Sequence, residues 1–170
     1  MINKENLTKD NLLVDMKIQS PMTIGDSVHF LRRQKPKVRI GFYSGRFSEI
    51  TGLDCVFLSL CKTRCDLLVV GVESDYSARV KKDEVRQTEK ERMFALASLS
   101  VVDYIILYDD ELPTTAMSLI NPDVVFTGLL SDDQEQRFIP KTEKIELINH
   151  PFERKVLDKK VIPLKYFNLG

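Results

Sequence analysis

Six cationic side chains lie within fourteen residues, between Arg79 and Arg92. They follow an apolar run of strand length, residues 67–72, and four carboxylates are interleaved with them. In a parallel sheet, the segment after a strand lies at the carboxyl edge, where ligands bind. The cations therefore indicate a site for an anionic ligand such as a phosphate. The interleaved carboxylates also fit the alternative of a solvated helix face held by salt bridges.

The turn after Tyr43 is a second candidate for chemistry. It begins Ser44-Gly45-Arg46-Phe47, follows an apolar run and leads into an expected helix. Gly45 allows the backbone to turn tightly, and the free N–H groups at a helix start suit a phosphate. The turn is neither a Walker loop nor a GxGxxG motif, so an ordinary turn between a strand and a helix is the alternative.

The elements that would position these residues alternate along the chain. Continuous apolar runs predict strands buried on both faces, and their alternation with helices predicts a parallel sheet. We therefore expect an α/β fold, a Rossmann-like three-layer doubly wound parallel sheet, over residues 23–170, preceded by a loosely ordered arm at 1–22 with a short element near 12–16. The expected strands are 38–43, 67–72, 101–107, 124–126 and 161–164, and the expected helices are 23–33, 54–62, 89–99, 114–120 and 141–149.

Helix ends and buried faces can also be predicted. Thr23 or Asp26 can cap the first helix, and Thr88 with Glu91 has the spacing of a capping box. The apolar positions expected to face the core are Val28, Phe30 and Leu31 in the first helix, and Val56, Phe57 and Leu60 in the second.

Composition excludes several classes of function. The 170 residues carry 25 basic and 25 acidic side chains, a balance that does not fit a strongly basic nucleic-acid-coating protein. No apolar run reaches about 18 residues, and the N-terminus lacks the apolar core of a signal peptide. We expect a cytoplasmic protein with no nucleic-acid or membrane partner. The spacing of Cys55, Cys61 and Cys65 matches no zinc pattern, and His29 and His150 lie far apart, so no protein metal site is expected.

The charges are unevenly distributed although they cancel overall. Residues 1–37 carry 7 basic and 4 acidic side chains, and residues 138–170 carry the same numbers. Residues 38–137 carry 11 basic and 17 acidic side chains, and residues 93–136 contain neither Lys nor Arg. An acidic central segment therefore lies between two mildly basic flanks.

Read in order, these motifs resemble the cytidylyltransferase-like nucleotidyltransferases. The similarity is greatest to the heptose-1-phosphate adenylyltransferase and glycerol-3-phosphate cytidylyltransferase group, and it covers about residues 23–165. The matching segments are Ser44-Gly45-Arg46-Phe47-Ser48, Val72-Glu73-Ser74-Asp75, Lys82, residues 86–92, Ser100-Val101-Val102-Asp103, residues 121–125 and residues 161–164.

The resemblance implies roles for individual residues. Catalytic positions would be Thr51, Asp54, Arg86, Thr88 and Arg92. Contacts to the nucleotide or its phosphates would come from Ser44, Gly45, Arg46, Phe47, Lys81, Lys82, Thr127 and Gly128. Ser74 and Asp75 would lie on the side of the second substrate. The implied ligands are ATP or CTP with Mg²⁺ and a phosphorylated small molecule, and family members often form homodimers.

The chain departs from the family at charged positions. The family motif H-x-G-H becomes Thr51-Gly52-Leu53-Asp54, so a carboxylate replaces the second His. A Val-x-Lys-Gly strand end becomes Phe126-Thr127-Gly128, and the closing Y-S-T-T helix is absent. A carboxylate repels a triphosphate unless Mg²⁺ lies between them.

Two functions therefore remain open from the sequence, and the alternative to both is an α/β domain that binds no small ligand. The first is a nucleotidyltransferase that acts on a sugar- or polyol-phosphate and releases pyrophosphate. The second is a catalytically impaired relative that serves as a nucleotide-binding, regulatory or assembly module. Losing one oxyanion-type donor costs about 10²–10³ in rate, and several such groups are altered here.

Overall fold

Five parallel strands form the central sheet of the computed structural model, in the order β3-β2-β1-β4-β5. The structure describes residues 14–80, 86–109, 113–127 and 146–149. The strands are β1 (Ile40–Gly45), β2 (Leu67–Glu73), β3 (Tyr104–Tyr108), β4 (Val124–Thr127) and β5 (Glu146–Asn149). This parallel sheet with helices on its faces confirms the predicted doubly wound α/β fold.

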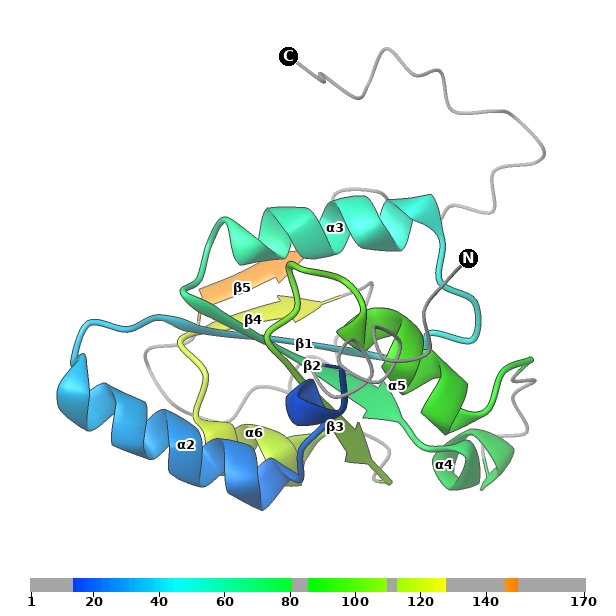
Figure 1. The fold of residues 1–170 in the computed structure, drawn as a ribbon, viewed down its shortest axis with the longest axis horizontal. Coiled ribbons are helices and arrows are strands. Elements are labelled where there is room, and N and C mark those ends of the chain that lie inside the picture. Colours follow the sequence, from blue (N-terminus) through cyan, green and yellow to red (C-terminus); the bar gives the residue numbers. More distant parts are fainter. Residues whose placement is uncertain (1–13, 81–85, 110–112, 128–145, 150–170) are drawn as a thin grey trace, which may run out of the picture.

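Helices cover both faces of the sheet (Figure 1). They are α2 (Pro21–Gln34), α3 (Gly52–Lys62), α4 (Asp75–Val80), α5 (Glu89–Ala97) and α6 (Thr114–Ile120). One apolar core joins α2 and α6 to one face, through residues such as Ile24, Met117 and Phe42. The other core joins α3 and α5 to the opposite face, through residues such as Phe57, Leu96 and Val70.

Helix α2 starts and faces differently from the sequence expectation. Its N-cap is Ser20, whose hydroxyl accepts the N–H of Thr23, so the prediction of Thr23 or Asp26 as the cap was wrong. Ile24 and Val28 are buried, whereas Phe30 is 62% exposed and is not the core residue we expected. The apolar pattern of α2 is too weak to set the helix phase, which is decided by packing on the sheet and on α6.

In α3, only one of the three expected inward positions is fully buried. Phe57 is buried, Val56 is partly exposed and Leu60 is 45% exposed. Leu58 and Cys61 are buried in their place. The buried thiol of Cys61 has a pKa raised above its usual range by burial and by the neighbouring Cys65, which fits a packing role.

The segment 146–149 is a strand and not part of the helix expected over 141–149. As β5 it pairs in parallel with β4, from Val124↔Glu146 to Thr127↔Asn149. Pairing with an open sheet edge overrides local helix propensity, which is a weak preference over four residues. Residues 141–145 and the strand expected at 161–164 lie outside the described residues.

The end of the N-terminal arm packs on the edge strand β3. Residues 14–17 form a helical turn, near the short element expected at 12–16, and Ile18 makes a parallel bridge to Ile105. The Gln19 N–H donates to the Ile105 carbonyl at 2.9 Å, and Lys17 Nζ donates to the Leu99 carbonyl at 3.0 Å. These contacts cover part of an open sheet edge. Within the described part of the chain, no helix has the length and apolarity to cross a bilayer.

Candidate functional site

The order of the strands locates the place where a ligand is expected. The chain places β2 and β3 on one side of β1, and β4 and β5 on the other. The order therefore reverses at β1, and the crevice beyond the carboxyl ends of β1 and β4 is the topological switch point. Ser44 and Gly45 end β1 there, and Thr127 ends β4.

A buried aromatic residue fixes the turn that leaves β1. Phe47 has a left-handed backbone, with φ at 53°, and its side chain is buried. Its ring packs edge-on against Tyr43, with ring centroids 5.6 Å apart. A Cβ at Gly45 would lie 3.3 Å from the same ring, so a glycine at this position avoids a tight contact with Phe47. Phe47 is therefore a structural anchor of this turn.

Thr51 and Asp54 close the start of α3 with a reciprocal capping box. Thr51 is the N-cap, and its hydroxyl accepts the Asp54 N–H at 3.4 Å. One carboxylate oxygen of Asp54 accepts the Thr51 N–H at 2.8 Å and its hydroxyl at 2.6 Å. The helix start thus carries a negative charge on the groups that would otherwise attract a phosphate.

Arg92 is the most deeply buried charged side chain in the described site. Its side chain has no exposed surface, and Nη2 lies 2.6 Å from the carboxylate of Asp75. The guanidinium also donates to the carbonyls of Arg46 and Gln87. Arg92 thereby ties α5 to the turns that follow β1 and β2.

The carboxyl of Asp75 is stabilised in its charged form. Partial burial opposes ionisation, but the hydrogen bond from Arg92, the N–H of Glu89 and the charges of Arg92 and Arg79 together lower its pKa. Glu89 makes a second hydrogen bond to the same residue, since its carboxylate accepts the Asp75 N–H at 2.8 Å. This loop is therefore fixed by side chains of α5.

Thr88 begins α5 with the capping box that the sequence predicts. Its hydroxyl accepts the N–H of Glu91 at 3.3 Å. In return, the Glu91 carboxylate accepts the N–H of Thr88 and its hydroxyl, both at 2.8 Å. These hydrogen bonds lower the pKa of Glu91. Thr88 is exposed, but its hydroxyl and the first turn of α5 are already occupied by protein groups.

Arg46 pairs with a buried carboxylate that we did not single out from the sequence. Its Nε lies 3.2 Å from Oε2 of Glu73, the last residue of β2. The Ser77 hydroxyl donates to Oε1 of Glu73 at 2.8 Å. The sequence did contain a signal for this ion pair, because Glu73 directly follows an apolar run. A carboxylate buried at such a position needs a cation as its partner. Burial and the Glu73 charge raise the pKa of Tyr108 above its usual range, although a hydrogen bond with Ser44 lowers it.

The remaining candidates lie in different environments. Ser74 is buried and its hydroxyl accepts the Ser77 N–H at 3.1 Å, which closes the first turn of α4. Arg86 is 78% exposed and lies 3.7 Å from the Glu49 carboxylate. Lys81, Lys82 and Gly128 lie outside the described residues.

The described residues do not form a cage for Mg²⁺. Within the part of the chain that the structure describes, no three His, Cys, Asp or Glu side chains cluster as metal ligands. Mg²⁺ is commonly held by substrate phosphates with one or two carboxylates. The Mg²⁺ that the resemblance implies would then be bound to the phosphates of the nucleotide.

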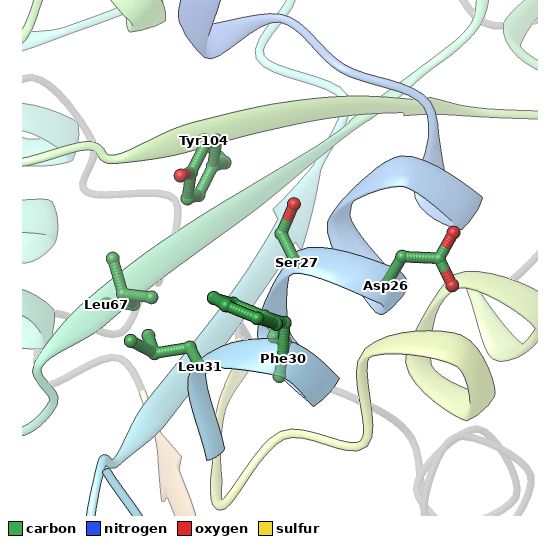
Figure 2. A pocket seen from close by; sticks show the side chains of 7 residues that line it. Asp26, Ser27, Phe30, Leu31, Leu67 and Tyr104 are labelled. Carbon is green, nitrogen blue, oxygen red and sulfur yellow. The ribbon is translucent and has the colours of Figure 1, made fainter. Parts of the chain in front are cut away.

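The hollows along α2 are separate from this site. A hollow of about 420 Å³ lies between α2 and the starts of β2 and β3 (Figure 2). It is lined by Asp26, Ser27, Val28, Phe30, Leu31, Leu67 and Tyr104. A second hollow of about 730 Å³ shares Leu31 and Leu67 with it and extends past Lys35–Val38. Both lie toward the amino ends of the strands, away from the switch point.

Curated proteins share sequence with more than half of this chain. It is 36% identical over 93 residues to the bifunctional protein HldE of Caulobacter vibrioides, covering 54% of the chain and 19% of that protein. HldE of Helicobacter pylori strain P12 is 34% identical over 92 residues, covering 53% of the chain and 20% of that protein. The match thus spans about a fifth of the length of these relatives. No protein-family model matches.

Solved structures share the fold. A lipopolysaccharide core biosynthesis protein from Thermoplasma volcanium superposes with a TM-score of 0.56 at 20% identity, covering 66% of this chain and 96% of that one. Pantoate-beta-alanine ligase from Francisella tularensis gives 0.52 at 14% identity, covering 81% and 67%. The HldE matches support the resemblance to cytidylyltransferase-like nucleotidyltransferases, and the solved structures confirm the Rossmann-like α/β fold.

Proposed function

We propose that this chain binds a nucleoside triphosphate at the switch point between β1 and β4, and transfers its nucleotidyl group far more slowly than an intact site would. The observation that supports this is charge pairing. Arg46 and Arg92 are matched by Glu73 and Asp75, and Asp54 occupies the start of α3.

Nucleotidyl transfer depends on positioning and on neutralising charge. A phosphate oxygen of the second substrate attacks the α-phosphorus of the triphosphate, and the bond to pyrophosphate breaks. Protein cations and helix N–H groups stabilise the developing charge in such reactions. Here Arg46 and Arg92 both have carboxylate partners, which reduces the positive charge that these two arginines offer to the transition state.

The second candidate is an active transferase for a sugar- or polyol-phosphate. It is favoured by the 36% identity to HldE over 93 residues of this chain. In that case the magnesium–nucleotide would displace the pairing carboxylates, and turnover would fall in the ordinary enzyme range of about 1–10³ s⁻¹.

Two measurements on the full chain test the proposal. Thermal unfolding is followed with millimolar magnesium–ATP or magnesium–CTP, and pyrophosphate release is assayed with a panel of sugar- and polyol-phosphates. We expect one nucleotide to raise the melting temperature, and pyrophosphate release to stay far below 1 s⁻¹. Rapid release would favour the second candidate, and no thermal shift with either nucleotide would contradict both.

A substitution at Asp54 tests whether the carboxylate at the start of α3 slows the transfer. Asp54→His removes the negative charge at the start of α3 and introduces a hydrogen-bond donor. We therefore expect the rate of pyrophosphate release to rise about tenfold or more. Asp66→His is the matched control, because Asp66 directly precedes β2 at the opposite end of the sheet. Equal rates in both variants would show that Asp54 does not limit the reaction.

A further inference from the structure

A carboxylate with almost no exposed surface ends strand β2 beside the candidate site. We propose that Glu73 is a specificity-determining residue, which holds Arg46 away from the ligand and so reduces the preference of the site for highly charged phosphates. The inference rests on the proposed nucleotide binding and names how that same site selects its ligand.

The pairing draws the Arg46 side chain toward one side of the sheet. Arg46 directly follows β1, and its Nε binds the Glu73 carboxylate at 3.2 Å, at the end of β2. In the strand order, β2 and β4 flank β1 on opposite sides. The guanidinium is therefore held on the β2 side, whereas the switch-point crevice opens between β1 and β4.

Burial makes this pairing persistent. The Glu73 side chain is 4% exposed, against 34% for Arg46, and Ser77 donates a second hydrogen bond to the carboxylate. A buried carboxylate that loses its partner is costly, whereas a partly exposed arginine can be hydrated. A ligand that attracts Arg46 must therefore draw this cation away from the buried Glu73 carboxylate.

The backbone of Arg46 is fixed as well. Its carbonyl accepts a hydrogen bond from the buried guanidinium of Arg92, so the turn cannot easily rotate its side chain toward β4. Each further negative charge on a ligand then meets the Glu73 carboxylate without gaining a new cation. The affinity should rise little from a nucleoside monophosphate to a triphosphate.

The experiment compares affinities for ATP, ADP and AMP by calorimetry, in the wild type and in Glu73→Gln. CTP, CDP and CMP replace them if the chain prefers cytidine nucleotides. Glu73→Gln keeps the size of the side chain and removes its charge. We expect the ratio of triphosphate to monophosphate affinity to rise about tenfold, since the variant removes the charge that holds Arg46 and leaves this cation available to the added phosphates.

Three further variants serve as controls for this test. Glu73→Met removes the charge without a buried amide that needs partners, so it serves if the glutamine variant folds poorly. Arg46→Gln combined with Glu73→Gln should lose the gain, because the gain acts through the released arginine. Asp66→Asn makes the same change of charge before the start of β2, and its affinity ratio should stay within twofold of the wild type.

The outcomes separate this inference from the proposed function. If the wild type binds nucleotides and both Glu73 variants keep its affinity ratio, the inference is overturned and the nucleotide site stands. If only the Glu73 variants bind a triphosphate, the inference holds and nucleotide binding by the native chain is refuted. If no variant binds any nucleotide, both fail.

Discussion

Arg92 shows how one residue can be essential to a site and yet be unavailable to a ligand. Its guanidinium donates to Asp75 and to two backbone carbonyls, and no part of its side chain is exposed. Such a buried cation holds loops together, and its removal leaves acceptors without donors. Its role in this structure is to position the turns after β1 and β2.

Replacing this arginine should destabilise the protein in a pH-dependent way. We expect Arg92→Met to lower the free energy of unfolding at pH 7 by about 3 kcal/mol. Asp75 has a lowered pKa in the folded protein, so its stabilisation is present above its ordinary pKa of about 4 and is lost as the pH falls further. The difference between wild type and variant should therefore shrink between pH 4 and pH 2.

Urea unfolding at pH 7, 4 and 2 measures this difference. The control is Arg33→Met on the exposed surface of α2, which should change stability by no more than about 0.5 kcal/mol at each pH. A destabilisation by Arg92→Met that stayed constant with pH would mean that the ion pair with Asp75 is not its cause.

At the scale of elements, the first turn of α3 is capped by a carboxylate at a position where the resemblance implies a phosphate contact. Asp54 stands at the position where the nucleotidyltransferases that the sequence resembles have a histidine, and it caps the helix together with Thr51. A capping carboxylate stabilises the N-terminus through its hydrogen bonds and its charge. The same interaction reduces the attraction of that N-terminus for phosphate, so helix stability and anion binding are opposed here.

Removing the cap should therefore affect stability measurably. Thr51→Ala is expected to lower the free energy of unfolding by about 1 kcal/mol, because the first turn of α3 loses its N-cap hydroxyl. Ser59→Ala on the same helix is the control, since its hydroxyl only bonds back to the Cys55 carbonyl. Chemical denaturation checks both variants, and equal stabilities would show that the capping box contributes nothing.

Across the whole molecule, the crossing of α2 and α6 joins two distant parts of the chain. A Cβ at Gly25 would lie 2.9 Å from the backbone oxygen of Leu119, so the two helices touch through their backbones. Arg32 strengthens the same contact by donating to the Asn121 carbonyl at 2.6 Å and to Asp123 at 2.9 Å. This packing fixes α2 over the face that it shares with α6.

Adding one methyl group at this crossing should be costly. We expect Gly25→Ala to destabilise the protein by about 1–2 kcal/mol, since backbone atoms must move apart despite the better helix propensity of alanine. Gly52→Ala, in the first turn of α3, has no atom within 4 Å of the new Cβ and should be neutral or stabilising by up to about 1 kcal/mol. Thermal unfolding compares the two, and equal effects would rule out a close crossing.

Local patterns determined much of this architecture. Unbroken apolar runs such as 67–72 identified buried parallel strands, and α6 begins and ends at the predicted residues, Thr114 and Ile120. The Thr88 capping box was also readable, because it depends on residues three positions apart. The ordered motifs around 44–48 and 72–75 indicated the resemblance to nucleotidyltransferases and predicted the carboxyl edge of the sheet as the ligand site.

Only the tertiary structure decided which charges remain for a ligand. Glu73 and Arg46 are 27 residues apart along the chain, and their pairing depends on the register between the neighbouring strands β1 and β2. The buried faces of α2 and α3, and the pairing of β5, likewise depend on surfaces supplied by distant segments. Sequence patterns report short-range periodicity, whereas the partner of a buried charge is set by contacts between elements that lie far apart along the chain.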